Sequence, residues 1–386
     1  MNRLYKIDPE ILSIVTTESN DEKKYDCIVY TKNCYDFKNN CLKDYDGEIY
    51  EYPFIKAFGV KLSKDRIISI ANMAVVTYIS KQSAVFTQIS VSKKIMGVDF
   101  FYKEGILGKG ITVAVIDTGI SRHLDFCLPK NKIIKFVDLI NNREVPYDDN
   151  GHGTFVSSII CGSGIVSGFK YAGVSPKTNV ISIKALEENG EAGAFKILEA
   201  MQWIYDNHEK YNIKVVCMSF GSSPTNKNDP MIMGAEALWN KGIVVVAAAG
   251  NSGPEEKTIK SPGASGKIIT VGGFDDKRME EKFVEENFEI ANFSSRGPAG
   301  YFYKPDVVAP AVNIVGANSK GGYVKMSGTS VATPMVAGIV CLMLNKFPHL
   351  SPNQIKAMLS KTCKKITNNK NNDGFGYINL NGLNIW

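Results

Sequence analysis

Three short segments of the chain hold a carboxylate, an imidazole and a hydroxyl, and each segment follows a break in the apolar pattern. Asp117 ends the apolar run ITVAVID, His152 lies between two glycines in DDNGHGT, and Ser330 lies in the small-residue turn SGTS. These groups can serve as nucleophile, general base and base-orienting carboxylate. Imidazole, with an ordinary pKa of about 6.5, can take the serine proton at neutral pH. The three residue types together predict nucleophilic acyl transfer.

Each segment taken alone also has an ordinary structural explanation. A strand that ends in Asp-x-Gly occurs in nucleotide-binding and receiver-type folds, and a serine at a helix start is often an N-cap. A single histidine is usually a surface or core residue, and we interpret His208 and His349 in this way. The glycines beside His152 favour a functional role, because they let a ligand approach the ring closely. Pro334, shortly after Ser330, is unusual for a simple helix cap.

A fourth segment, VVVAAAGNSG, offers a donor for a developing negative oxygen. The apolar run 242–248 ends just before Asn251, whose side-chain amide can point into a site at the end of a strand. Preorganised donors of this kind are worth on the order of 10²–10³ in rate each. The chain order Asp117, His152, Ser330 differs from the order in α/β-hydrolases and from that in chymotrypsin-like enzymes.

These motifs together resemble those of one known family. The blocks DTG, GHGT and GTSxATP, with AAGN between the last two, are similar to the motifs of the subtilisin family of serine endopeptidases. Further similar pieces are SFG at 219–221, NFSSRGP at 292–298 and KPDVVAP at 304–310. The resemblance extends from about residue 90 to the end of the chain.

The resemblance implies a role for each matching residue. Asp117 would orient His152, His152 would act as base and then acid, and Ser330 would be the nucleophile. Asn251 and the backbone N–H of Ser330 would form the oxyanion hole. The resemblance also implies two segments that bind substrate. The strand that pairs with the substrate backbone would be Ser219, Phe220 and Gly221. One wall of the specificity pocket would be Ala248, Ala249 and Gly250.

Two alignments with the family predict cleavage after Glu or Gln. Matching Ser261-Pro262-Gly263 to the family's corresponding turn places Lys260 near the floor of the specificity pocket. The alternative, that Lys260 turns outward on its flexible stem, stays open. Matching 78–88 to the family's propeptide ending makes Gln88–Ile89 the expected self-cleavage bond, and Gln88 is the neutral isostere of glutamate.

The resemblance also raises the question of a structural calcium ion. Asp125 matches an aspartate that often holds calcium in the family, but the loop 163–173 is short and lacks the expected carboxamide side chains. We therefore assign no metal-binding residues, expect that no cofactor is required, and leave a structural calcium open. A chelator should have little effect.

The elements that must position these groups are predicted by near-continuous apolar runs alternating with amphipathic stretches. Such runs are typical of strands buried on both faces of a parallel sheet. The expected strands are 111–116, 180–186, 214–220, 242–248 and 267–271, and the expected helices include 194–208 and 231–241. The charge-dense segment 275–288 is expected to be a solvated loop or hairpin. The pattern predicts an α/β fold with a doubly wound, mostly parallel sheet flanked by helices, similar to subtilisin.

Residues 1–88 have a different texture and are expected to form a separate small α/β domain, with the catalytic domain at 89–386. Strand-like pieces at 27–31, 54–62 and 75–79 surround a helical pattern at 64–73. This segment resembles the family's inhibitory propeptide, which would occupy the active-site cleft as an intramolecular partner. An unrelated N-terminal domain is the alternative.

Composition limits the other functions. The 386 residues are 44% hydrophobic and 22% charged, with a net charge of +6 and without a cluster of five Lys or Arg. We therefore expect peptide or protein substrates and no nucleic-acid partner. The longest apolar runs have about seven residues, against ~20 for a membrane-spanning helix, so we expect no membrane partner. No pair of the eight cysteines has the C-x-x-C spacing of zinc or redox sites, and the N-terminal segment does not resemble a secretory signal peptide. We therefore expect a cytoplasmic location, although export without a signal peptide stays open.

The sequence leaves two alternatives to a self-inhibited protease zymogen. One is a catalytically silent member of the family that serves as a binding or signalling module, although such proteins typically lose a catalytic residue and none is lost here. The other is an enzyme whose N-terminal segment stays attached as a permanent lid.

Overall fold

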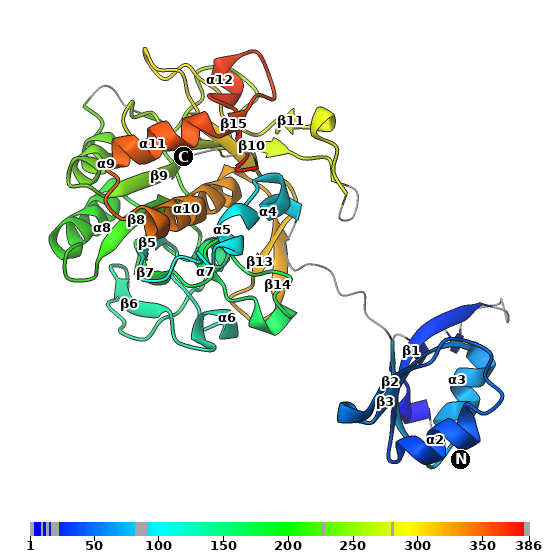
Figure 1. The fold of residues 1–386 in the computed structure, drawn as a ribbon. Coiled ribbons are helices and arrows are strands. Elements are labelled where there is room, and N and C mark those ends of the chain that lie inside the picture. Colours follow the sequence, from blue (N-terminus) through cyan, green and yellow to red (C-terminus); the bar gives the residue numbers. More distant parts are fainter. Residues whose placement is uncertain are drawn as a thin grey trace. The chain divides into compact units, whose positions relative to one another are not determined.

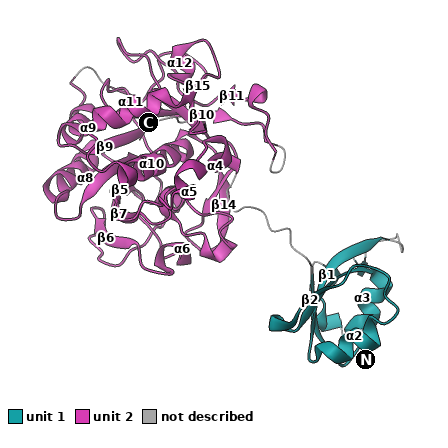
Figure 2. Cartoon of the chain, viewed as in Figure 1, with its two compact units in different colours: residues 1–87 teal, residues 88–386 magenta. Residues whose placement is uncertain are grey.

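The computed structural model describes residues 4–8, 11–12, 15–16, 23–81, 91–224, 228–278 and 282–381. The chain divides into two compact units, Met1–Thr87 and Gln88–Trp386 (Figure 2). The proposed cleavage residues Gln88 and Ile89 lie outside the described residues.

In its described residues, unit 1 contains a four-stranded antiparallel sheet and helices. The strand order is β2–β3–β1–β4, and Val29, Phe58, Ile67 and Ile79 are among its fully buried core residues. The predicted strand 54–62 begins late, because a 3₁₀ turn at Pro53–Ile55 precedes it. The elements are η1 (Leu4–Lys6), β1 (Lys24–Thr31), α2 (Cys34–Cys41), β2 (Tyr50–Tyr52), η2 (Pro53–Ile55), β3 (Ala57–Ser63), α3 (Lys64–Ala71) and β4 (Val76–Lys81).

Unit 2 is built on a twisted, mostly parallel sheet (Figure 1) with the order β15–β16–β12–β10–β9–β8–β5–β7–β6. All neighbouring strands in this order from β16 to β6 pair in parallel. Strand β15 pairs with β16, and β11 pairs with β10, in the antiparallel direction. The strands are β5 (Thr112–Asp117), β6 (Ile133–Asp138), β7 (Asn179–Lys184), β8 (Ile213–Met218), β9 (Val244–Ala248), β10 (Ile269–Asp275), β11 (Glu289–Ile290), β12 (Val307–Pro310), β15 (Cys363–Lys364) and β16 (Tyr377–Ile378), with a separate hairpin of β13 (Ile314–Ala317) and β14 (Tyr323–Met326).

Helices flank this sheet. One pair, α7 and α10, packs together and against β5, and another pair, α8 and α9, packs together and against β5 and β9. Every residue of β5 and of β9 is buried, so both faces of the central strands are covered. The helical segments are α4 (Val91–Ile95), α5 (Asp99–Lys103), α6 (Leu124–Cys127), α7 (His152–Cys161), η3 (Ile165–Ser167), α8 (Ala194–Asn207), α9 (Pro230–Asn240), η4 (Glu285–Asn287), α10 (Thr329–Lys346), α11 (Pro352–Lys361) and α12 (Lys370–Asp373). The predicted fold class is confirmed.

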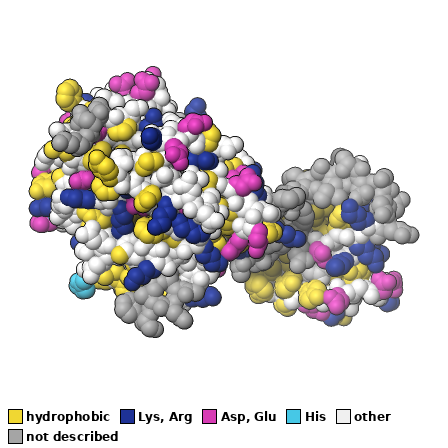
Figure 3. Space-filling model, turned by 90° about the horizontal axis from the view of Figure 1, so that it is seen from above, with side chains coloured by type: hydrophobic (Ala, Val, Ile, Leu, Met, Phe, Trp, Pro, Cys, Tyr) yellow, Lys and Arg dark blue, Asp and Glu magenta, His cyan; other side chains and the backbone are white. Residues whose placement is uncertain are grey.

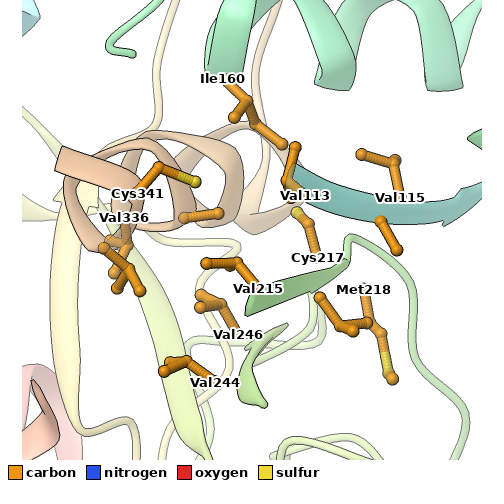
Figure 4. Packing of buried hydrophobic residues seen from close by; sticks show 14 of the residues in the cluster. Val113, Val115, Ile160, Val215, Cys217, Met218, Val244, Val246, Val336 and Cys341 are labelled. Atoms are coloured by element: carbon orange, nitrogen blue, oxygen red, sulfur yellow. The ribbon is translucent and has the colours of Figure 1, made fainter. Parts of the chain in front are cut away.

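The core between the sheet, α7 and α10 contains free thiols as small apolar side chains. Figure 4 shows Cys217 of β8 and Cys341 of α10 among valines of β5, β8, β9 and α10. Burial raises the pKa of Cys217 to about 12, so its thiol stays protonated. These cysteines therefore serve in packing, as their apolar surroundings in the sequence suggest.

One described helix, α10, is long and apolar enough by composition to cross a membrane. However, 83% of its apolar window is buried inside unit 2, and the helix forms the centre of the core. Gly, Thr and Ser residues interrupt the apolar residues of α10, so a search for uninterrupted apolar runs in the sequence does not find this helix. On the face of unit 2 in Figure 3, basic and acidic side chains are interspersed.

The segment 275–288, expected to be a solvated loop or hairpin, contributes two buried residues in its described part, Asp276 and Phe288. Strand β11 pairs with the end of β10 in an antiparallel arrangement, consistent with a hairpin. Phe288 is buried and packs against Phe274 and Tyr377, whereas residues 279–281 are outside the described part of the chain.

Candidate active site

The carboxylate and the imidazole meet where β5 ends and α7 begins. Asp117 is the last residue of β5 and is fully buried, and its Oδ1 lies 2.8 Å from Nδ1 of His152, the first residue of α7. The same oxygen accepts the backbone N–H of Thr118 at 2.8 Å. The close approach requires a glycine after His152, because a Cβ on Gly153 would collide with the carbonyl oxygen of Gly119. The sequence prediction that Asp117 orients His152 therefore has direct geometric support.

A second carboxylate, Asp148, fixes the start of α7. Its Oδ1 accepts the N–H of Gly151 and the hydroxyl of Thr118, both at 2.8 Å. Its Oδ2 accepts the N–H and the hydroxyl of Thr154, at 2.8 and 2.6 Å. Asp148 thereby satisfies free N–H groups at the helix N-terminus and ties the helix to the residue after Asp117. No motif argued from the sequence singles out this residue, although it stands at the start of the DDNGHGT block.

Opposing effects act on the pKa of His152. Burial of the half-buried ring lowers the pKa, whereas the charge and hydrogen bond of Asp117 and the charge of Asp148 raise it. The carboxylates prevail, so the pKa of His152 lies above its ordinary value of 6.5. Because Asp117 holds Nδ1, the other ring nitrogen is left to exchange a proton with substrate or nucleophile.

Ser330 is the second residue of α10, a helix that begins directly after a glycine in a conformation that residues with side chains rarely adopt. Gly328 precedes the helix with φ of 152°, and Ser330 itself is half-buried. A Cβ on Gly328 would lie 3.0 Å from Oγ of Ser330 and 3.3 Å from Nδ2 of Asn251. The nucleophile and the proposed oxyanion donor are therefore neighbours across this glycine.

The amide of Asn251 has a defined orientation. Its Oδ1 accepts both the backbone N–H and the hydroxyl of Thr329, each at 2.9 Å. Because a backbone N–H can only donate, this contact fixes the oxygen toward Thr329 and leaves Nδ2 free to donate. The exposed Asn251 can thus present an N–H to an oxyanion beside Ser330.

The segment NFSSRGP supports the loop that carries Asn251. The hydroxyl of Ser295 accepts the N–H of Ser252 at 3.0 Å, and the N–H of Ser295 donates to the carbonyl of Gly250 at 2.9 Å. Ser295 thus holds both neighbours of Asn251. This positioning role explains why the segment belongs with the catalytic motifs.

The hydrogen bond from Ser330 to His152 is not formed in the structure, although both residues are among those described. Catalytic hydrogen bonds are often long before substrate binds and tighten in the reacting complex. Helices α7 and α10, which carry the two residues at their N-termini, pack against each other.

The predicted substrate-binding segments lie at the carboxyl ends of β8 and β9, where ligands bind in open α/β sheets. After β8, Ser219 is buried, Phe220 is half-buried and Gly221 is exposed. At the end of β9, the predicted pocket-wall residues are all buried, namely Ala248, Ala249 and Gly250.

Lys260 lies between these two segments. The Cβ of Lys260 is 2.7 Å from the point that a Cβ on Gly221 would occupy, and the aliphatic part of its side chain also contacts Gly250. The backbone N–H of Lys260 donates to the carbonyl of Ala249 at 2.8 Å. Its Nζ donates to the hydroxyl of Ser223 at 3.2 Å. The structure thus brings Lys260 to both predicted pocket segments.

Asp125 does not fit a calcium site, because protein donors already occupy its carboxylate. Oδ2 accepts the hydroxyl of Tyr323 at 2.6 Å, and Oδ1 accepts the N–H of Val166 at 3.1 Å and the hydroxyl of Ser163 at 3.4 Å. Across the described residues, no group of three His, Cys, Asp or Glu side chains could hold a metal ion.

Together, the fold and the site define a subtilisin-like serine protease. A parallel α/β sheet carries Asp117 and Asn251 at its carboxyl edge, and two core helices begin at His152 and Ser330. The chain belongs to the subtilase family, whose model matches residues 108–377.

Individual relatives agree with this assignment. The chain is 39% identical to serine protease AprX of Bacillus subtilis over 67% of this chain, and the match spans 62% of that protein. It is 30% identical to subtilisin DY of Bacillus licheniformis over 68% of this chain and 87% of that protein. Among solved structures, Sphericase matches 74% of this chain and 97% of its own with a TM-score of 0.62 and 26% identity.

Proposed function

We propose that the chain hydrolyses peptide bonds through an acyl-enzyme on Ser330. His152 takes the hydroxyl proton as Oγ attacks the carbonyl carbon, and Nδ2 of Asn251 with the N–H of Ser330 stabilises the oxyanion. His152 then gives the proton to the leaving amine. Water, activated by the same ring, releases the acid and regenerates the serine.

The observation that carries this proposal is the 2.8 Å contact between Asp117 and His152, at the edge of the sheet where Asn251 is also held. A serine-directed fluorophosphonate probe should label Ser330. Labelling that continues unchanged in Ser330→Ala would contradict the assignment.

We further propose that unit 1 is an inhibitory propeptide removed by self-cleavage at Gln88–Ile89. Unit 1 has its own core, and Tyr30, Tyr52 and Tyr78 share a cross-strand row on the face of its sheet opposite that core. A row of half-buried aromatic side chains on the face of a sheet opposite its core is suited to binding a second surface.

Purified active protein should separate on a denaturing gel into a fragment of about 9–10 kDa and the remainder, at ~110 Da per residue. Ser330→Ala protein should stay intact and should be cut when active enzyme is added. N-terminal sequencing identifies the bond, and a mature start outside residues 86–91 would refute its position. An active enzyme that is never cut would support the permanent lid instead.

We also propose that the enzyme cuts after Glu or Gln. The supporting observations are that the stem of Lys260 contacts Gly221 and Gly250, and that Nζ contacts a hydroxyl and lacks a carboxylate partner among the described residues. A side-chain carboxylate or carbonyl of the substrate can accept from this ammonium.

A positional peptide library tests the preference. Lys260→Ala should weaken cleavage after Glu but keep labelling of Ser330, and Lys260→Glu should shift the preference toward basic residues. Lys177→Ala, at an exposed lysine, is the control. A wild-type preference for Arg or Phe would exclude the proposal. A cytoplasmic location stays a prediction.

A further inference from the structure

The loop after α7 is held by four side chains that come from distant parts of unit 2. The carboxylate of Asp125 accepts the hydroxyl of Tyr323, and the backbone carbonyl of Asp125 accepts the N–H of Ser163 at 2.9 Å. The tyrosine is 198 residues further along the chain and lies on β14. Burial and the neighbouring carboxylate raise the pKa of Tyr323, so its hydroxyl remains a donor.

Two buried ammonium groups bind the carbonyl oxygens of the same loop. Nζ of Lys132 donates to the carbonyl of Cys161 at 2.5 Å and to that of Pro176 at 2.8 Å. Nζ of Lys93 donates to the carbonyl of Ala172 at 2.7 Å. Cys161 is the last residue of α7, so Lys132 places a positive charge at the negative end of the helix that carries His152.

A second tyrosine covers the end of the loop. The hydroxyl of Tyr102 contacts the carbonyl oxygens of Gly173 at 3.1 Å and Val174 at 2.7 Å. Tyr102 lies on α5 and Lys93 on α4, the first described elements after residue 90. The beginning of unit 2 is thereby fastened to the loop 161–176.

Carboxylate and carbonyl oxygens are the ligands that calcium takes, usually six to eight in number. Here both oxygens of Asp125 already accept hydrogen bonds from protein donors, and five carbonyl oxygens of 161–176 contact the side-chain donors of Lys93, Tyr102 and Lys132. Lys93 and Lys132 together also bring the two positive charges of a calcium ion. We propose that Lys93, Tyr102, Lys132 and Tyr323 replace a structural calcium ion in this chain and fasten 161–176 to Asp125 and to 91–103.

Thermal unfolding of the full chain tests the replacement without relying on activity. Ser330→Ala protein avoids self-digestion, and measurement at about pH 6.5 keeps Lys93 charged, because burial lowers its pKa to about 8. A calcium site with a Kd one hundredth of the free calcium concentration would raise Tm by roughly 5–10 °C. We expect the same Tm in excess calcium and in chelator. A calcium-dependent rise that Asp125→Asn abolishes would overturn the proposal.

Substitutions in the same background test the four side chains. Tyr323→Phe should lower Tm by roughly 2–10 °C, because it leaves a buried carboxylate oxygen unpaired. Tyr301→Phe, at a fully exposed tyrosine, should leave Tm unchanged. Equal Tm values for the two variants would refute the role of Tyr323.

Hydrogen exchange tests the link to the beginning of unit 2 in case Tyr323→Phe does not fold. Lys93→Met should speed amide exchange in both 91–103 and 161–176, because it removes the cation that joins them. Lys177→Met, at an exposed lysine just beyond the loop, should not. Unchanged exchange in both segments of Lys93→Met would refute the fastening.

Discussion

Thr329 lies beside the nucleophile and controls the orientation of the oxyanion donor. Its hydroxyl donates to Oδ1 of Asn251 at 2.9 Å and accepts the buried N–H of Gly250 at 3.2 Å. Thr329→Val keeps the shape of the side chain and the backbone N–H contact but removes both hydroxyl contacts. The amide of Asn251 then keeps one of its two hydrogen bonds and turns more freely.

The expected loss is modest and appears mainly in turnover. One hydrogen bond contributes about 1 kcal/mol, which corresponds to about a fivefold lower kcat. Complete loss of the donor in Asn251→Ala should lower kcat on the order of 10²–10³, a figure established for this donor in a subtilisin. KM should change little in both variants, because the bond to the oxyanion forms in the transition state.

Steady-state kinetics on a peptide substrate, with a double-mutant cycle, measures the effect. If Thr329 acts through Asn251, then Thr329→Val should add nothing in the Asn251→Ala background. Thr333→Val is the matched control, because its buried hydroxyl donates to the carbonyl of Thr329 at 2.7 Å and leaves Asn251 untouched. An unchanged kcat in Thr329→Val, or an equal loss in both backgrounds, would show the reasoning to be wrong.

Further measurements examine the base and its surroundings. His152→Ala should lose nearly all kcat, because the catalytic residues act as a unit; substantial residual turnover would exclude it as the base. Because neutral His152 is the active form and its pKa is raised, kcat/KM should increase with pH through an inflection above 6.5. Asp148→Asn should move that inflection to lower pH, whereas Asp206→Asn, at an exposed carboxylate of α8, should not; identical pH profiles for Asp148→Asn and the wild type would refute the electrostatic role of Asp148. Lys184→Met should lower the free energy of unfolding in urea by about 1–3 kcal/mol, because this fully buried ammonium donates to the carbonyl of Thr118 and to Asp149.

The strands that carry the site were predictable because burial on both faces leaves a plain local signal. The runs around β5, β8 and β9 are almost entirely apolar, and the structure places these strands within a few residues of the predicted ranges. Strand β6 is interrupted by an exposed lysine and β14 is only partly buried, so neither gives such a run. The hairpin of β13 and β14, which supplies Tyr323, had no comparable signal.

The sequence by itself determined which residues could do the chemistry. Asp117, His152, Asn251 and Ser330 each stand in a short block at the end of a strand or the start of a helix, and backbone geometry at such places is set by neighbouring residues. Local sequence therefore carries the information.

The tertiary structure alone decided which groups hold these residues in place. Asp148 reaches Thr118 across 30 residues, Thr329 reaches Asn251 across 78, and Tyr323 reaches Asp125 across 198. A hydrogen bond needs its two atoms within about 3 Å, with suitable angles, and chain separation does not encode that distance. Only the packed arrangement of α7, α10 and the β13–β14 hairpin brings such partners together.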